Sequence, residues 1–195
     1  MIRIQEFAEG LSAIPEKEFT HERVLAFLRE NRVDPASLAP YLYFSREHYT
    51  RNLIHKTSLF ELIAICWESG QRSPIHNNCD QNCWMATPYG KVQVQNFRLV
   101  HRDATAMTCE LEPSTHFVIE PDSPQEVDPA EPIHLVANAA SFGSRAVTLH
   151  IYSRPYDTCE VYDLKEKSYR VVQMVNTSEY GVLQTEMKVE KVLLT

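Results

Sequence analysis

Two histidines of this chain stand in settings that suit metal binding. His76 lies in the stretch GQRSPIHNNCDQNCWMATPYG, which begins at residue 70, and Asn78 follows it two positions later. Because side chains at i and i+2 of a β-strand point to the same face, positions 76 and 78 would project together. His134 lies in a second apolar segment, with Pro129 five residues before it. Neutral imidazole is a common transition-metal ligand, so both histidines are candidate metal ligands.

Arginine and tyrosine add further chemistry. Arg51 begins a short apolar run, and its planar guanidinium is a two-pronged donor that fits a carboxylate. His150 and Tyr152 are two residues apart on a predicted strand, so they would face the same interior. A tyrosine beside a metal can give or accept a proton, and a nearby imidazole can tune it.

The first 45 residues are predicted to be helical and to precede the part that carries these residues. Phe7 and Leu11 are four positions apart, as on one face of a helix. Thr20 is a suitable N-cap for a second helix, and Asp34 followed by Pro35 marks the start of another. We therefore expect two or three short helices at this end.

The rest of the chain, from residue 49 to about residue 180, contains short β-favouring runs separated by turn residues. The predicted strands are 51–55, 59–67, 83–89, 91–101, 107–111, 115–120, 133–137, 146–153, 160–162 and 169–175. Many short strands without βαβ alternation predict a barrel or sandwich. We expect one mostly β domain over 1–195, with the barrel over 49–180 and an extra strand or a tail in the last twelve residues.

The composition is that of a globular protein. The 195 residues suffice for one well-buried core, and the net charge of −7 leaves no basic stripe for nucleic acid. The N-terminus lacks the features of a secretory signal, and no apolar run approaches ~18 residues. We expect a cytoplasmic protein that binds neither nucleic acid nor membrane, with most of its five cysteines as free thiols. The sequence specifies no oligomeric state.

The spacing of the candidate residues resembles two cupin motifs. The stretch 70–90 has the spacing of the first motif, with Asn78 where a second histidine normally stands and Cys83 where an acidic residue does. The segment around His134 resembles the second motif, with Glu131 at the usual glycine position. Together, in this order and among strands, the motifs imply a metal-binding cupin jelly-roll barrel.

Four segments also resemble the cysteine dioxygenase type I family. They are YTRNL at 49–53, SPIH at 73–76, NCW at 82–84, and LHIYS at 149–153 with residues 155–159 beyond it. The resemblance covers more than half of the chain. It implies an iron(II) enzyme that adds both atoms of O2 to the sulfur of a small thiol and produces a sulfinic acid.

By this resemblance, His76 and His134 would be two of three histidine ligands of Fe(II), although another divalent transition metal would fit as well. Asn78 replaces the third histidine, and its amide oxygen is neutral but a harder and weaker donor. Four outcomes follow: Asn78 binds through its oxygen, water takes the third place, the Cys79 thiolate takes it, or the site holds no catalytic iron. Cys79 ranks last of the ligands because a regular strand would point it away.

The same resemblance implies roles for five other residues. Arg51, with Tyr49 near it, would bind the substrate carboxylate. Cys83 and Tyr152 match a pair that can be joined as a thioether beside the iron. His150 would hydrogen-bond the Tyr152 hydroxyl.

Two functions fit these residues. The first is a dioxygenase that oxidises cysteine or a related carboxylate-bearing thiol with O2, with chemistry that Asn78 could alter. The second is a catalytically silent cupin that binds a small molecule as a sensor or scaffold. Loss of one histidine favours the second function, whereas retention of the rest of the set favours the first.

Overall fold

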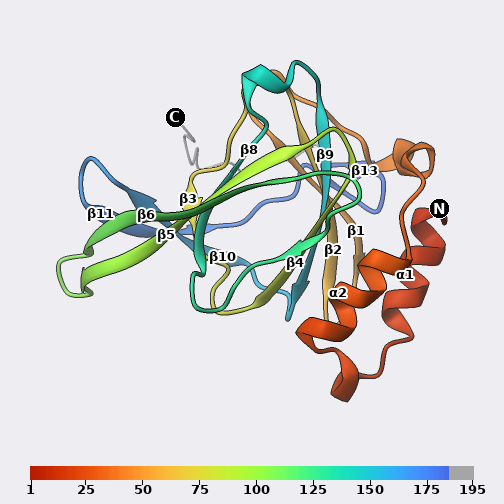
Figure 1. Cartoon of the computed structure of the whole chain (residues 1–195), viewed down its shortest axis with the longest axis horizontal. Helices are drawn as coiled ribbons and strands as arrows, with labels where there is room; N and C mark the ends of the chain where they lie inside the picture. Colours follow the sequence, from red (N-terminus) through yellow and green to blue (C-terminus); the bar gives the residue numbers. More distant parts are fainter. Residues whose placement is uncertain (185–195) are drawn as a thin grey trace.

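The structure is a computed structural model, and residues 1–184 of it are described (Figure 1). Its helical elements at the N-terminus are α1 (Ile4–Ser12), η1 (Glu16–Glu18), α2 (His21–Glu30) and η2 (Pro35–Tyr41). The Thr20 hydroxyl caps α2 by accepting from the backbone N–H of Arg23 at 3.3 Å, and Asp34 caps η2 in the same way. The predicted short helices are confirmed. The prediction for the last twelve residues concerns positions that, apart from Gln184, lie outside the described part.

Strands make up most of the remaining chain. They are β1 (Thr50–Lys56), β2 (Glu61–Trp67), β3 (Ile75–His76), β4 (Asn82–Tyr89), β5 (Val92–Asp103), β6 (Thr108–Ile119), β7 (Gln125–Glu126), β8 (Ile133–Ala137), β9 (Ala146–Ser153), β10 (Thr158–Asp163), β11 (Ser168–Gln173), β12 (Ser178–Glu179) and β13 (Val182–Leu183). A 3-10 turn, η3 (Ala140–Phe142), separates β8 from β9.

These strands form two sheets that face each other. One sheet has the order β13-β12-β1-β2-β9-β4-β7, and the pairings of the other close on themselves in the order β10-β11-β6-β5-β8-β3. Apolar residues of both sheets, including Ile63, Met85, Val94 and Val136, pack together between them. The predicted fold class, a mostly β cupin jelly roll with short N-terminal helices, is confirmed.

The first sheet is covered on both faces, which explains why β2 is buried at all seven positions. Leu62, Ala64 and Cys66 pack outward against the N-terminal helices, which lie together on that side of the sheet (Figure 1). Ile63 and Ile65 point inward, toward the second sheet. A strand that is buried on both faces is apolar throughout rather than alternating, as the sequence of β2 is after its first residue.

Pro113 lies within a strand, although it falls between the strands predicted at 107–111 and 115–120. The runs expected at 107–111 and 115–120 form one strand, β6, which pairs with β5 in a hairpin that projects from the barrel (Figure 1). The β5–β6 register shifts between Gln95 and Phe97, and Phe97 then pairs with Pro113. A bulge beside the proline accommodates its missing N–H, so the ladder continues past it.

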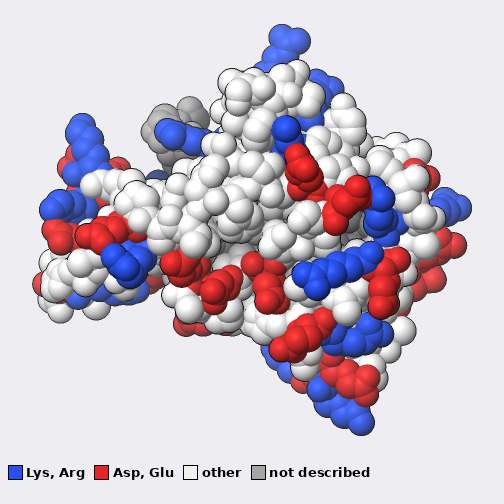
Figure 2. Space-filling model, in the orientation of Figure 1, with Lys and Arg blue, Asp and Glu red and all other residues white. Residues whose placement is uncertain are grey.

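The surface carries charges of both signs. On the face of the described residues shown in Figure 2, Lys and Arg side chains are interspersed with Asp and Glu. Several form exposed ion pairs, such as Arg98 with Glu112 at 2.7 Å. Within residues 1–184, the helices are all too short or too polar to cross a membrane.

Candidate active site

His76 and His134 lie side by side between the two sheets. They are direct partners in the antiparallel pairing of β3 with β8, so both side chains project from the same face. Their ring centres are 4.6 Å apart. The structure therefore brings together two histidines that are far apart in the sequence.

The protonation of this pair leaves a free lone pair on each ring. Nδ1 of His76 lies 3.0 Å from the Pro74 carbonyl, and Nδ1 of His134 lies 3.1 Å from the Pro132 carbonyl. A carbonyl only accepts, so each Nδ1 carries the proton and each Nε2 is unprotonated. Burial lowers the pKa of His76 to about 4 and that of His134 to about 3, so both are neutral near pH 7.

The same tripeptide, Pro-Ile-His, builds both halves of the pair. It occupies positions 74–76 and 132–134, and in each copy the proline carbonyl fixes the histidine two residues later. The isoleucines, Ile75 and Ile133, point to the opposite face and pack in a separate apolar cluster. A hydrogen bond to the second nitrogen of a ligand histidine is typical of metal sites, because it fixes the ring and its tautomer.

Asn78 is buried nearby, although not by the strand alternation that the sequence suggests. β3 ends at His76, and Cys79 and Asp80 follow with positive φ angles of 48° and 57°. The Asn78 side chain is only 2% exposed, and its Oδ1 accepts from the Tyr156 hydroxyl at 3.0 Å. Its Nδ2 is buried without a hydrogen-bond partner among the described residues. The amide thus has one satisfied end and one unsatisfied end.

The side chains on either side of Asn78, Asn77 and Cys79, contact β10 and its first residues. The Cys79 thiol donates to the Thr158 carbonyl at 2.8 Å and packs beside Cys159 and Val161. Asn77 is held by β10, where its Oδ1 accepts from the backbone N–H of Glu160 at 3.0 Å. Both side chains are therefore engaged with β10.

Arg51 projects from β1 into the same interior. Its guanidinium carbon lies 5.7 Å from the centre of the Tyr152 ring, and its Nε is buried without a hydrogen-bond partner among the described residues. Its charge helps to lower the pKa of both His76 and His150, although burial is the larger cause. Arg51 forms no ion pair with a carboxylate in residues 1–184. The site thus holds a guanidinium whose charge is available to an anionic ligand.

Tyr49 is placed by stacking. Its ring lies 4.8 Å from that of Trp67, nearly parallel to it. Burial raises the pKa of Tyr49, and the nearby charge of Arg51 opposes that shift. Tyr49 therefore lies in the neighbourhood of Arg51, as the sequence suggests.

A chain of hydrogen bonds runs along the inward face of β9. The Trp67 indole N–H donates to the Thr148 hydroxyl at 2.9 Å, and Nε2 of His150 lies 2.9 Å from the same hydroxyl. Nδ1 of His150 lies 3.0 Å from the Tyr152 hydroxyl. These four side chains are buried, so their donors and acceptors must match.

The single proton of the Thr148 hydroxyl sets the direction of these hydrogen bonds. The Thr148 hydroxyl already accepts from Trp67, and its single proton is satisfied by donation to Nε2 of His150. Nδ1 of His150 then carries a proton and donates to the Tyr152 oxygen. The proton of Tyr152 is left free to point into the site. Burial raises the pKa of Tyr152, which keeps that proton in place near pH 7.

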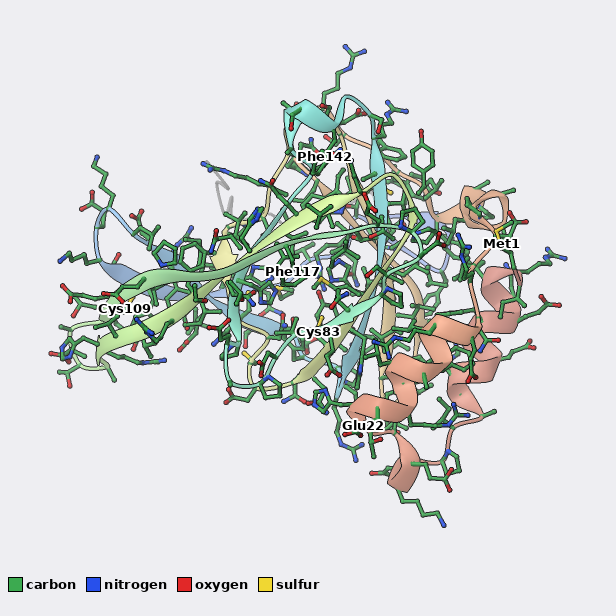
Figure 3. The ribbon with its side chains drawn as sticks, in the orientation of Figure 1. Met1, Glu22, Cys83, Cys109, Phe117 and Phe142 are labelled. Carbon is green, nitrogen blue, oxygen red and sulfur yellow. The ribbon has the colours of Figure 1, made fainter. Side chains whose placement is uncertain are left out.

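Cys83 lies directly beside Tyr152 on the neighbouring strand. The two residues are partners in the β4–β9 pairing, and Figure 3 shows Cys83 near the middle of the barrel. Burial raises the pKa of its thiol, while Arg51 and the Tyr152 hydroxyl act in the opposite direction. Cys83 is a free thiol in this structure.

A cavity of about 360 Å³ opens onto this interior. Arg51, Glu61 and Tyr156 are among the residues that line it, and its remaining walls come mainly from residues 174–184. That segment is fixed to β1 by parallel pairing of Asn52 with Ser178. The volume is within the range of small-molecule sites, so the cavity offers a route for a small ligand to Arg51.

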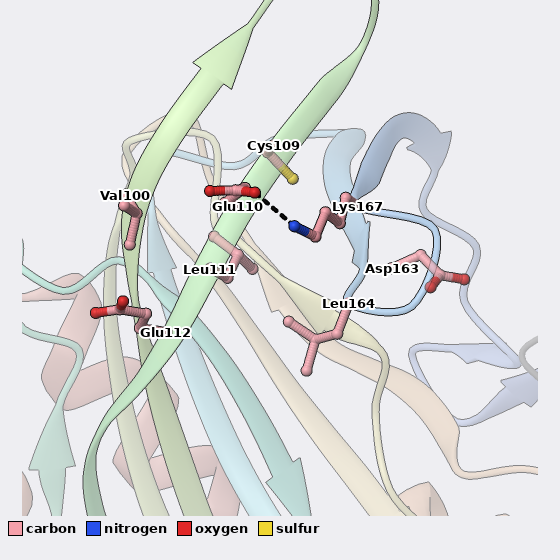
Figure 4. A pocket seen from close by; sticks show the side chains of 8 residues that line it. All are labelled: Val100, Cys109, Glu110, Leu111, Glu112, Asp163, Leu164 and Lys167. Carbon is pink, nitrogen blue, oxygen red and sulfur yellow. Dashed lines mark hydrogen bonds and ion pairs between the residues drawn. The ribbon is translucent and has the colours of Figure 1, made fainter.

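A second cavity, of about 210 Å³, lies at the outer end of the β5–β6 hairpin (Figure 4). It is lined by Glu110 and Lys167, which form an ion pair at 2.6 Å, and by several apolar side chains. Cys109 lies there too, far from Cys83 (Figure 3). None of the predicted site residues lines this cavity.

Sequence reasoning missed three residues of the interior: Thr148, Tyr156 and Glu61. Thr148 precedes His150 by two positions, so the alternation that linked His150 to Tyr152 could have included it. Glu61 is a charged residue at an inward position of an otherwise apolar strand, which is also a readable signal. Tyr156 lies in a loop, and its contact with Asn78 has no sequence signal.

The fold and site define a cupin whose interior holds a histidine pair, a guanidinium and a tyrosine. A model of the family "Cysteine dioxygenase type I" matches residues 11–165. The chain therefore belongs to the cysteine dioxygenase type I family, and the predicted family is confirmed.

Curated relatives agree with this assignment. Cysteine dioxygenase type 1 of Bos taurus is 28% identical over 167 residues, which cover 85% of this chain and 81% of the relative. The Rattus norvegicus protein of the same name is 29% identical over 166 residues, covering 85% and 80%. Among solved structures, a Klebsiella pneumoniae protein with a double-stranded β-helix domain is 9% identical with a TM-score of 0.48, covering 71% of this chain and 90% of its own.

Proposed function

We propose that this protein is an iron(II)-dependent thiol dioxygenase that converts a small carboxylate-bearing thiol, such as cysteine, to its sulfinic acid with O2. The observation that carries the proposal is the pair of imidazole Nε2 lone pairs, on rings 4.6 Å apart, in an interior that also holds Arg51. Membership of the cysteine dioxygenase type I family supports the same chemistry.

The residues present fit an iron ion with one qualification. His76 and His134 each offer a neutral nitrogen, and their second nitrogens are already fixed. The described residues contain no group of three or more His, Cys, Asp or Glu side chains arranged around one point, so the third protein donor would be Asn78. The two ends of the Asn78 amide can be exchanged by a half-turn of the side chain. Nδ2 would then donate to the Tyr156 hydroxyl, and Oδ1 would lie where Nδ2 now has no hydrogen-bond partner.

Each of the other residues has a defined task in the proposed reaction. When bound, iron(II) supplies the redox chemistry that couples O2 to the sulfur. Arg51 binds the substrate carboxylate, because a planar guanidinium matches two carboxylate oxygens. Tyr152 holds a proton beside the reacting atoms, and His150 keeps its hydroxyl oriented. Buried apolar residues such as Ile63 and Met85 exclude water around them.

Cys83 and Tyr152 would be joined as a thioether in the proposed enzyme, a link that their pairing in β4 and β9 supports. Formation of the carbon–sulfur bond removes one hydrogen from the thiol and one from the ring, and O2 takes up the two electrons and two protons to give hydrogen peroxide. Intact-mass and peptide analysis of protein that has turned over would detect the loss of both hydrogens. The Cys83→Ser variant should keep both hydrogens, because it has no thiol to form the thioether.

The test is metal analysis of the purified protein, followed by oxygen uptake with cysteine and identification of the product. We expect bound iron, uptake that depends on the thiol, and a sulfinic acid. Arg51→Met should raise the KM for a carboxylate-bearing thiol, since it removes the charge and retains the bulk. Protein with no bound transition metal and no uptake would overturn the proposal.

A second function, binding without catalysis, is favoured by one observation. The amide oxygen of Asn78 already accepts a hydrogen bond from Tyr156. The site therefore offers a metal fewer free ligand atoms than a site with three histidines. The Asn78→His variant separates the two functions. If a weak third ligand limits a dioxygenase, this variant should bind iron more tightly and oxidise thiols faster. A silent binding protein would bind the thiol in both forms and oxidise it in neither.

A further inference from the structure

Three sulfur-bearing side chains meet where β10 and β11 lie beside the turn that follows β3. They are Cys79, Cys159 and Met174, and they pack with Val161 and Val172 in a small apolar cluster of their own. Sγ of Cys159 lies 3.3 Å from Sδ of Met174. None of the three has a task in the proposed reaction. The fold thus gathers sulfur ligands from three separate segments at one place.

Cys79 is turned into this cluster by the backbone. Its φ of 48° lies in the left-handed region, which residues other than glycine seldom adopt. Its thiol donates to the carbonyl of Thr158 at 2.8 Å, and Thr158 directly precedes Cys159. Cys79 is half-buried, whereas Cys159 is 2% exposed. Cys79 is therefore the more accessible of the two thiols in the cluster.

The spacing of the sulfurs suits a bound metal ion. Sulfur ligands lie ~2.3 Å from a metal ion, so two ligands of one ion are at most about 4.6 Å apart. The distance of 3.3 Å between the sulfurs of Cys159 and Met174 satisfies this limit. The third sulfur, of Cys79, would leave the Thr158 carbonyl and turn to the ion. Three sulfurs would then surround one ion.

The ligand types indicate which metal would bind. Thiolates and thioethers are soft ligands, and together they favour Cu(I) over hard cations that prefer oxygen. Zn(II) is usually held by four protein ligands in a structural site, and this cluster offers three sulfurs. Val161 and Val172 give the cluster an apolar side, which suits an ion of low charge.

We propose that Cys79, Cys159 and Met174 form a binding site for one monovalent copper ion, separate from the histidine pair. On binding, the two thiols release their protons to solvent, and two thiolates and one thioether sulfur hold the ion. Copper stays Cu(I), so no electron is transferred. The inference goes beyond the proposed function and does not depend on it.

The experiment is an anaerobic titration of the full chain, with its metal as isolated, with Cu(I) in competition with a chromophoric copper(I) chelator. We expect one ion per chain and near-ultraviolet absorption from thiolate-to-copper charge transfer. Cys79→Ser should weaken binding at least about 100-fold, because loss of even an outer partner of a metal ligand costs about 10- to 100-fold. Met174→Leu should weaken binding less and keep the absorption, since both thiolates remain.

Cys109→Ser is the matched control, because Cys109 is a buried free thiol at the outer end of the hairpin. It should leave the copper affinity unchanged. His134→Gln should keep the thiolate absorption, which would place the ion on sulfur rather than on the histidine pair. Circular dichroism checks that each variant is folded, and half-buried Cys79 is the position where serine is best tolerated.

Two results would overturn the inference: a parent protein without thiolate-to-copper absorption, or a folded Cys79→Ser variant with the affinity of the parent. Tighter binding of Zn(II) than of Cu(I) to the same cysteines would overturn the assignment to copper. Absence of iron and of oxygen uptake would overturn the proposed function and leave the copper site unaffected.

Discussion

The two faces of β9 are equally buried but chemically opposite. Apolar residues point outward to the N-terminal helices: Val147, Leu149 and Ile151. Polar or ionisable residues point inward to the second sheet: Thr148, His150 and Tyr152. All six are at most 3% exposed. Burial by itself therefore does not distinguish the packing face from the site.

The difference lies in how polar groups are satisfied. The polar chain on β9 is complete within the protein, from the Trp67 indole to the Tyr152 oxygen. Across the interior, the unsatisfied atoms belong to Arg51, Glu61 and Asn78, which are three of the five residues with such atoms in the described part of the chain. Most buried polar groups of a folded protein have a protein or water partner, so each of these unpartnered atoms is a candidate contact for a ligand or an ordered water. The comparison thus distinguishes polar groups that are satisfied within the protein from polar groups that are open to such a contact.

The largest effect should come from removing one imidazole of the inward side. His134→Ala should lower iron content and reduce thiol oxidation to the level of buffer, because even the outer partners of metal ligands are worth about 10- to 100-fold. Metal analysis and oxygen uptake measure it. His116→Ala, on the exposed hairpin, is the matched control and should change neither. Full activity in the His134 variant would contradict the metal role.

The outward side should respond in stability instead. Phe7, on α1, is 1% exposed, and the centre of its ring lies 5.2 Å from that of Phe27. Both belong to the apolar cluster that covers β2 and β9. Phe7→Ala should lower the free energy of unfolding by about 3–5 kcal/mol, measured by urea titration. The folded variant should oxidise thiols at a rate close to that of the parent. A selective loss of oxidation in folded protein would break the division between the two faces.

The histidine pair should also make stability depend on pH in metal-free protein. Burial lowers the pKa of His76 to about 4 and that of His134 to about 3, from 6.5. At a pH between the folded and the unfolded pKa of a histidine, the unfolded chain binds more protons than the folded chain. The free energy of unfolding therefore falls as the pH falls below 6.5. We expect a loss of about 3 kcal/mol from each histidine, about 6 kcal/mol in all, between neutral pH and pH 4.

Urea titration at several pH values measures this slope. His134→Gln should flatten it, because the amide does not titrate in this range. An unchanged slope would mean that other groups control the acid response.

The smallest effect concerns the polar chain on β9. Thr148→Val removes the acceptor of the Trp67 indole and the donor to His150 while keeping the side chain's shape. We expect the free energy of unfolding to fall by about 1–2 kcal/mol, because buried groups lose their partners. Thr148→Ser retains the hydroxyl and is the control. Equal stability of the Val and Ser variants would show that the hydrogen bonds of Thr148 do not stabilise the inward face of β9.

Much of the fold could be read from the sequence, because it depends on local pattern. Capping at Thr20 and the β-favouring run at 146–153 indicate a helix start and a strand whatever surrounds them. The prediction of two separate strands, 107–111 and 115–120, was wrong, because a bulge in β6 beside Pro113 accommodates the missing N–H. Such compensation depends on pairing between segments, which one segment does not reveal.

The amino-acid sequence determined which groups are available: two Pro-Ile-His segments, an arginine on the first strand and a His-x-Tyr pair on a late one. Tertiary structure alone decided that the Tyr156 hydroxyl contacts the Asn78 amide and that His76 is paired with His134. The physical reason is range. Side-chain direction along a strand follows from alternation every two residues, whereas the partner of a buried polar atom depends on which distant strand is packed within about 3 Å of it.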